Sequence, residues 1–361
     1  MKLFKCQVCD QLLYFENSLC VKCNHRLGYL PDDETMHAVE ATGEAWHAPG
    51  APDRLFRFCA NVDLNACNWL VQMDSAEHFC LACRHNRTIP DISHPANIEA
   101  WRKMEIAKHR LFYSLLKLHL PLANRMDDPQ AGLVFDFLAD PPDGSRVTTG
   151  HADGVITVSL READDSEREA RRTQMREPYR TLLGHFRHEA GHYYWDKLVR
   201  DENKIEECRA IFGDEREAYA NALQRHYDWG PPADWQNDYI SAYAAAHPWE
   251  DFVESWAHYL HIVDTLETAA SFGVNVRPKL DLKGELAAKV DFDPYRAESV
   301  EKLIDSWLPI AFAVNNINRS MGQPDVYPFL LSENVINKLG FIHRLIHSER
   351  KPATARGNGR I

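Results

Sequence analysis

Long hydrophobic runs are missing from this sequence of 361 residues. No apolar stretch approaches the roughly 18 residues that a membrane span requires, which argues against a membrane partner. The chain also begins without the apolar segment of a secretory signal, because residues 2–5 lead directly into a cysteine motif at Cys6. We therefore expect a soluble, cytoplasmic protein.

Basic residues are outnumbered by acidic ones, and the second half of the chain has almost no cysteine. The sequence has 53 acidic and 41 basic residues and a formal net charge of -12, a balance that argues against nucleic acid as a partner. Eight of its nine cysteines fall within the first 83 residues, which leaves Cys208 alone in the second half. We expect Cys208 to be a packed thiol rather than a nucleophile.

Two closely spaced cysteine pairs stand near the start of the chain, Cys6-x2-Cys9 and Cys20-x2-Cys23. Each pair can offer two thiolates to one tetrahedral ion, which is the spacing of a zinc ribbon. A reducing cytoplasm favours metal over disulfides at such thiols. We predict a zinc ribbon over residues 1–30 with a structural zinc ion, because so short a module cannot bury a core of its own.

A looser set of four cysteines follows, with the spacing C-x7-C-x12-C-x2-C: Cys59, Cys67, Cys80 and Cys83. The last two form a good metal-binding pair, whereas the first two are too far apart to be diagnostic. Buried thiols without a metal are the alternative at this point. Because residues 24–55 contain several Gly and Pro and no sustained apolar period, residues 31–95 are predicted to be a loop-rich second module.

The segment 177–200 carries the pattern H-E-x-x-H, from His188 and Glu189 to His192. Apolar residues recur in it at three- and four-residue intervals, which predicts an amphipathic helix with Pro178 in its first turn. Histidines four residues apart lie one turn above each other, so both imidazoles can bind one zinc ion. Glu189 is then placed beside the open position of that ion.

A zinc site of this kind needs a third protein ligand. The position of the third metzincin histidine holds Leu198, which excludes that class. Asp196 lies too far along the helix to share the ion, and a supporting role behind the ligands suits it better. A second predicted helix, 247–269, offers Glu250 as the ligand and Glu254, one turn on, as a hydrogen-bond acceptor for a ligating imidazole.

The segments RTLLGHFRHEAGHYYWD and HPWEDFVESWAHYLH make the chain resemble a bacterial family of zinc-binding metallopeptidases with an N-terminal zinc ribbon. The resemblance covers nearly the whole chain and implies that the second cysteine set also binds zinc. More distantly, E-D-F-V-E is similar to the E-F-F-A-E segment of the lethal-factor protease domain, a gluzincin. That similarity implies that Glu250 binds the metal, that Glu254 supports the site, and that Tyr243 stabilises the transition state.

Other patterns predict the remaining elements. Four histidines are expected to be packed side chains rather than ligands: His226, His247, His258 and His261. Residues 146–149 and 155–160 are predicted to form a hairpin around Asp153-Gly154, with 155–160 as the sheet edge that pairs with a peptide substrate. A buried strand is expected at 133–138, helices at 98–120 (capped by Asn97), 161–176, 214–227, 298–320 and 333–347, and a disordered tail at 351–361.

Together these patterns predict an α+β fold, with a mostly helical zincin-like domain and a small sheet over residues 96–350. The predicted activity is peptide-bond hydrolysis by metal-activated water with Glu189 as general base, using one catalytic and two structural zinc ions. The partner is then a protein or peptide substrate, and a protein partner of the zinc ribbon stays open. Two alternatives remain: an interaction module with a vestigial peptidase half, and a zinc hydrolase of a non-peptide amide.

Overall fold

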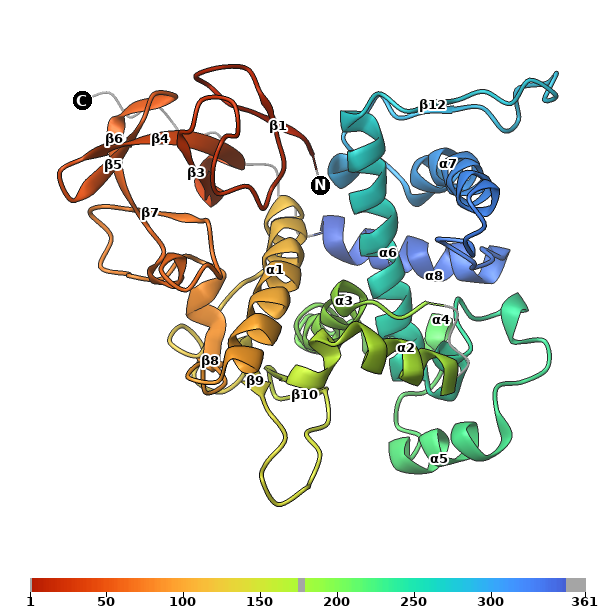
Figure 1. Cartoon of the computed structure of the whole chain (residues 1–361). Helices are drawn as coiled ribbons and strands as arrows, with labels where there is room; N and C mark the ends of the chain where they lie inside the picture. The colour runs from red at the N-terminus through yellow and green to blue at the C-terminus, as the bar shows by residue number, and fades with distance from the viewer. Residues whose placement is uncertain (1, 175–178, 349–361) are drawn as a thin grey trace, which may run out of the picture.

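A computed structural model of the chain describes residues 2–174 and 179–348. The fold is α+β, as predicted, with strands gathered in the N-terminal part and helices in the rest (Figure 1). Within the described ranges, no helix has both the length and the apolar character that crossing a bilayer would need. The predicted tail and Pro178 lie outside the described residues.

The N-terminal part contains a small hairpin and a five-stranded antiparallel sheet in the order β3-β4-β5-β6-β7. The hairpin strands and the sheet strands are β1 (Phe4–Lys5), β2 (Leu12–Leu13), β3 (Arg26–Leu30), β4 (Thr35–Thr42), β5 (Ala45–Ala48), β6 (Ala51–Phe58) and β7 (Leu70–Gln72). The prediction of a loop-rich segment here was therefore wrong. Tight turns through Glu34 and Gly43, both with positive φ, separate the strands. Strand β4 has eight residues, but residues 36–39 are buried in succession and 40–42 are exposed, so it lacks the alternation that marks a strand in sequence.

A second sheet of four strands has the order β10-β11-β9-β8. Its strands are β8 (Asn86–Thr88), β9 (Val134–Leu138), β10 (Gly150–Ala152) and β11 (Val155–Ser159). The hairpin at Asp153-Gly154 is confirmed, but its first strand is 150–152, directly beside the two-residue turn, and not 146–149. The prediction of 155–160 as an edge strand was also wrong, because β11 lies between β10 and β9 and the edge strands are β10 and β8.

The two parts of the chain share one hydrophobic core. Helix α1 (Pro95–Lys117) lies between them, and its Tyr113 packs against Phe15 and Tyr29 of the N-terminal part, with ring centroids 5.4 and 6.2 Å apart. Strand β8 follows the last cysteine pair and pairs with β9. The cysteine-rich region is thus joined to the helical region by packing and by backbone pairing.

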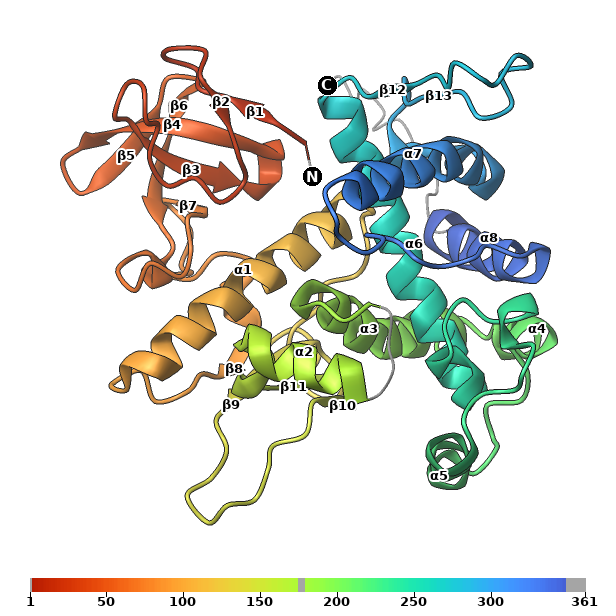
Figure 2. The same ribbon diagram turned by 45° about the vertical axis from the view of Figure 1, so that its right-hand side comes forward.

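The remaining helices surround α6, which runs through the centre of the helical part (Figures 1 and 2). They are α2 (Asp165–Gln174), α3 (Leu182–Trp195), α4 (Ile205–Phe212), α5 (Tyr219–Trp229), α6 (Pro248–Ser271), α7 (Val300–Ser320) and α8 (Glu333–Ser348). A π-helical turn (Asp196–Arg200) follows α3, a 3-10 turn η7 (Tyr243–Ala246) precedes α6, and a hairpin of β12 (Asn275–Val276) and β13 (Ala288–Lys289) precedes α7.

Helix starts differ most from the predictions. Helix α3 begins at Leu182, because the Thr181 hydroxyl accepts a hydrogen bond from the Gly184 N–H at 3.0 Å and caps the helix. Helix α1 begins at Pro95 and not after Asn97, α2 begins four residues late, and α5 begins five residues late. Helix α4 was not predicted.

Helices α3 and α6 pack closely because α3 carries Gly191 at their contact. A Cβ atom at this position would lie 3.0 Å from the Cβ of Val253, which is closer than ordinary van der Waals contact. We expect Gly191→Val to lower the free energy of unfolding by about 1–3 kcal/mol through overpacking. Denaturant unfolding measures this loss, and Gly150→Val is the control because a Cβ there has no neighbour within 4 Å. Equal stability of the two variants would contradict the prediction.

Candidate metal centres

Metal-ligand side chains converge at three places in the described residues. In each group the candidate donor atoms lie within 4.8 Å of one another. One group joins His188, His192 and Glu250, and the other two are the predicted sets of four cysteines. A further group, Cys83 with Glu105 and His109, overlaps the second cysteine set.

The group of two histidines and one glutamate is built by α3 and α6. His188 and His192 stand one turn apart on α3, with ring centroids 5.3 Å apart. Glu250 lies in the first turn of α6, which begins at Pro248 after the His247 ring caps it by accepting the N–H of Trp249 at 3.0 Å. The Nε2 atoms of His188 and His192 lie 3.2 Å and 3.7 Å from oxygens of Glu250.

One buried oxygen shows that this group suits a cation. Oε1 of Glu250 accepts a hydrogen bond from the Tyr219 hydroxyl at 2.5 Å, whereas Oε2 is buried and has no hydrogen-bond partner in the described residues. A bare carboxylate oxygen in a buried place is costly unless something binds it. Together with the two imidazoles it makes a set of three ligands that suits zinc and leaves a fourth position open.

Glu254 supports the group from one turn further along α6. The Nδ1–H of His188 donates to Glu254 Oε1 at 2.7 Å, and the Ser241 hydroxyl donates to Oε2 at 2.6 Å. Burial alone would raise the pKa of Glu254, but these hydrogen bonds and the charge of His188 lower it to about 2. An ionised Glu254 fixes His188 with its Nε2 toward Glu250, which is the usual arrangement behind a metal-bound histidine.

Glu189 is half-buried and follows His188 directly. Burial raises the pKa of its carboxyl to about 7, while His188 acts in the opposite direction. The ring of Tyr243 lies 6.0 Å from that of His188 (centroid to centroid), so this side chain stands next to the group. Asp196, in contrast, accepts a hydrogen bond from Arg200 at 2.7 Å and is not part of the donor group.

Sequence reasoning missed three side chains at this group. Tyr219 and Ser241 hydrogen-bond to the two glutamates, and the ring of His151 on β10 stacks on that of His192, 5.9 Å away and within 8° of parallel. None of the three is at a motif spacing from the H-E-x-x-H pattern, so the sequence carried no signal for them. His151 lies on the edge strand β10, so this edge of the second sheet lies beside the metal group.

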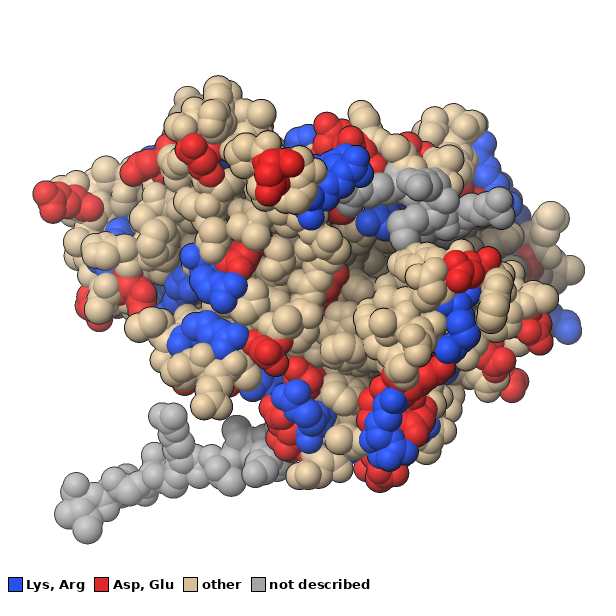
Figure 3. Space-filling model, turned by 90° about the horizontal axis from the view of Figure 1, so that it is seen from below, with Lys and Arg blue, Asp and Glu red and all other residues tan. Residues whose placement is uncertain are grey.

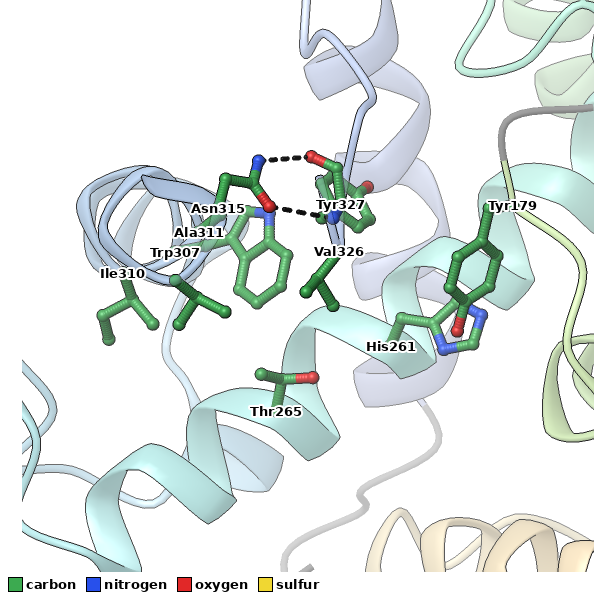
Figure 4. A pocket seen from close by; sticks show the side chains of 10 residues that line it. Tyr179, His261, Thr265, Trp307, Ile310, Ala311, Asn315, Val326 and Tyr327 are labelled. Atoms are coloured by element: carbon green, nitrogen blue, oxygen red, sulfur yellow. Dashed lines mark hydrogen bonds between the residues drawn. The ribbon is translucent and has the colours of Figure 1, made fainter. Parts of the chain in front are cut away.

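The other predicted histidines have partners of their own. His258 hydrogen-bonds to the Tyr327 hydroxyl at 2.9 Å, His261 accepts from Arg187 at 2.5 Å, and the ring of His226 packs against Tyr243. Tyr327 and His261 also line an apolar cavity of about 90 Å³, in which Tyr179 stands beside His261 (Figure 4). That volume is smaller than the roughly 300 Å³ at which small-molecule sites usually begin.

Charged side chains do not separate by sign on the face shown in Figure 3. Acidic and basic residues stand next to each other around a hollow whose visible surface is mostly uncharged (Figure 3). A one-sign basic stripe, the usual footprint of a nucleic-acid site, is not seen on this face.

The first cysteine set has the shape of a tetrahedral thiolate site. Sγ of Cys6 lies 3.6 Å from that of Cys23, and Cys9 and Cys20 are equally close. We expect the double variant Cys6→Ser/Cys9→Ser to bind one zinc ion fewer than the unchanged protein, because two thiolates cannot hold the ion. Metal analysis by mass spectrometry measures this. If this double variant kept all its zinc, or lost the same ion that His192→Ala removes, the first cysteine set would not be a separate zinc site.

The second cysteine set is more deeply buried and touches α1. Sγ of Cys67 and Cys80 are 3.7 Å apart, and His109 Nε2 lies 3.3 Å from Cys67. Glu105 and Lys108 form a fully buried ion pair beside it, 2.9 Å apart. Lys108 also donates to Asn86 on β8, so α1 and the second sheet meet at this cluster.

Comparisons with known proteins agree with these centres. Residues 97–345 match the model of a family described as "Putative zinc-binding metallo-peptidase", and residues 3–94 match that of a zinc-ribbon domain. Three uncharacterized mycobacterial proteins, one from Mycobacterium bovis and two from strains of Mycobacterium tuberculosis, are 40% identical over 347 residues. The match covers 96% of this chain and 95% of each relative. No solved structure matches the chain.

Proposed function

Because the chain belongs to this family of zinc-binding metallopeptidases with an N-terminal zinc-ribbon domain, we propose that it hydrolyses peptide bonds at the group of His188, His192 and Glu250. The buried Glu250 carboxylate between the two imidazoles, whose Oε2 has no hydrogen-bond partner in the described residues and lies 3.2 Å from Nε2 of His188, is the observation that carries the proposal. Two histidines of an H-E-x-x-H helix with a glutamate from a later helix are the ligand set of a gluzincin-type site.

His188, His192 and Glu250 would hold the zinc ion, which when bound would supply an activated water and polarise the carbonyl of the bond to be cleaved. Glu189 accepts the proton of that water and later returns it to the leaving amine. Tyr243 donates a hydrogen bond to the oxyanion that forms at the carbonyl, and Glu254 keeps His188 in the tautomer that frees its Nε2.

One edge of the second sheet suits an extended peptide. Strand β10 is an edge strand in the described residues, and the ring of its His151 stacks on that of His192, so a peptide paired with β10 would pass the metal group. Strand addition of this kind lets main-chain hydrogen bonds provide affinity. We further propose that the two cysteine sets each hold one structural zinc ion, which makes three ions per chain.

A cleavage screen tests the activity. Proteome-derived peptides are incubated with zinc-loaded protein or with Glu189→Gln protein, and new peptide termini are identified by mass spectrometry. We expect cleavages that only the unchanged protein produces. Zinc-loaded protein that cleaves no peptide would contradict a peptidase function and favour hydrolysis of a non-peptide amide.

A further inference from the structure

Tyr219 reaches the metal group from a part of the chain that carries no motif. It is the first residue of α5, and its hydroxyl donates to Oε1 of Glu250 at 2.5 Å. The other carboxylate oxygen, Oε2, has no hydrogen-bond partner in the described residues and lies 3.2 Å from Nε2 of His188. The two oxygens of Glu250 are therefore in different environments.

This difference bears on how Glu250 can bind a metal ion. A carboxylate that binds with both oxygens takes up a position that a hydrolytic zinc site keeps open for water or substrate. Oε1 also lies 3.7 Å from Nε2 of His192, so both oxygens are near an imidazole. A hydroxyl that donates to Oε1 occupies that oxygen and leaves Oε2, 3.2 Å from Nε2 of His188, as the one available to a metal ion. We propose that Tyr219 is the positioning residue of Glu250, and that it holds this carboxylate as a one-oxygen ligand. The inference rests on the proposed metal site.

The contacts of the Tyr219 ring and of its hydroxyl are with different groups, so a substitution can test the hydroxyl alone. The ring contacts His247 and Trp249, the neighbours of Glu250, with centroids 5.2 and 6.0 Å away. Phenylalanine keeps both ring contacts, so Tyr219→Phe removes only the interactions of the hydroxyl, which are the hydrogen bond to Glu250 and one to the Tyr243 side chain. Tyr243 differs, because its ring faces His188 and its proposed role is toward the substrate.

We therefore expect substitution of the two tyrosines to have different effects, on zinc affinity for Tyr219 and on turnover for Tyr243. We expect Tyr219→Phe to weaken zinc binding about 10- to 100-fold, the range found when a partner behind a metal ligand is removed. Tyr243→Phe should bind zinc like the unchanged protein while its turnover falls. Tyr239→Phe is the matched control, since its ring packs against the Lys338 ammonium at 4.4 Å and phenylalanine keeps that contact.

The experiment is a zinc titration of all four proteins against a chelator of known affinity. The relevant ion is defined as the one that His192→Ala removes, which separates it from ions at the cysteines. Equal zinc affinity of Tyr219→Phe and Tyr239→Phe would overturn the inference, as would a loss confined to Tyr243→Phe. The titration needs no substrate, so it still decides the role of Tyr219 if the protein binds zinc here but cleaves no peptide. If the unchanged protein has no such ion, the metal site and the inference fail together.

Discussion

We expect peptide hydrolysis by Glu189→Gln protein to fall to background while its zinc content stays at that of the unchanged protein. The amide has nearly the same volume as the carboxyl but cannot accept the proton of the attacking water, and a lost general base costs about 10²- to 10⁴-fold in rate. His188 and His192 keep their positions because neither hydrogen-bonds to Glu189 in the described contacts. The measurement is turnover of a cleaved peptide together with metal analysis of the same sample.

The control for this variant is a glutamate elsewhere on the surface. Glu202→Gln makes the same chemical change at an exposed residue after the π-helical turn, and its turnover should equal that of the unchanged protein. If Glu189→Gln protein retained turnover within a few-fold of Glu202→Gln, another group would have to be the base.

The second large effect separates the two glutamates of α6. Glu250→Ala leaves two imidazoles and should empty the site, because two protein ligands do not hold zinc in a hydrolytic centre. Glu254→Ala removes the hydrogen bond to His188 Nδ1, for which the expected loss of zinc affinity is about 10- to 100-fold. Both variants are titrated against a chelator. If Glu250→Ala bound zinc almost normally and Glu254→Ala bound it weakly, Glu254 would be the zinc ligand and Glu250 the supporting residue.

The sequence predicted the elements in which one periodic pattern runs without interruption. The apolar period and the histidine spacing predicted α3 with both imidazoles on one side, and Pro248 predicted the start of α6. The cysteine spacing predicted the first set of four donors and the family resemblance implied the second, and the structure brings the thiols of each set together.

Elements fixed by tertiary contacts were harder to predict. Strands β4 and β6 have eight residues each, but their buried and exposed residues do not alternate, because neighbouring parts of the fold cover one end of each strand on both faces. Which strand of the second sheet is at the edge depends on pairing with β9, far away in sequence. Tyr219 and Ser241 reach the glutamates only after α5 and η7 fold back onto α6, and no local pattern records that.

The most direct test of the catalytic zinc site is anomalous X-ray scattering at the zinc absorption edge from crystals of the protein. We predict three peaks per chain, two inside the cysteine sets and one within about 2.2 Å of Nε2 of His188, Nε2 of His192 and Oε2 of Glu250. Peaks at the cysteines with none between these three atoms, in crystals grown with excess zinc, would contradict it.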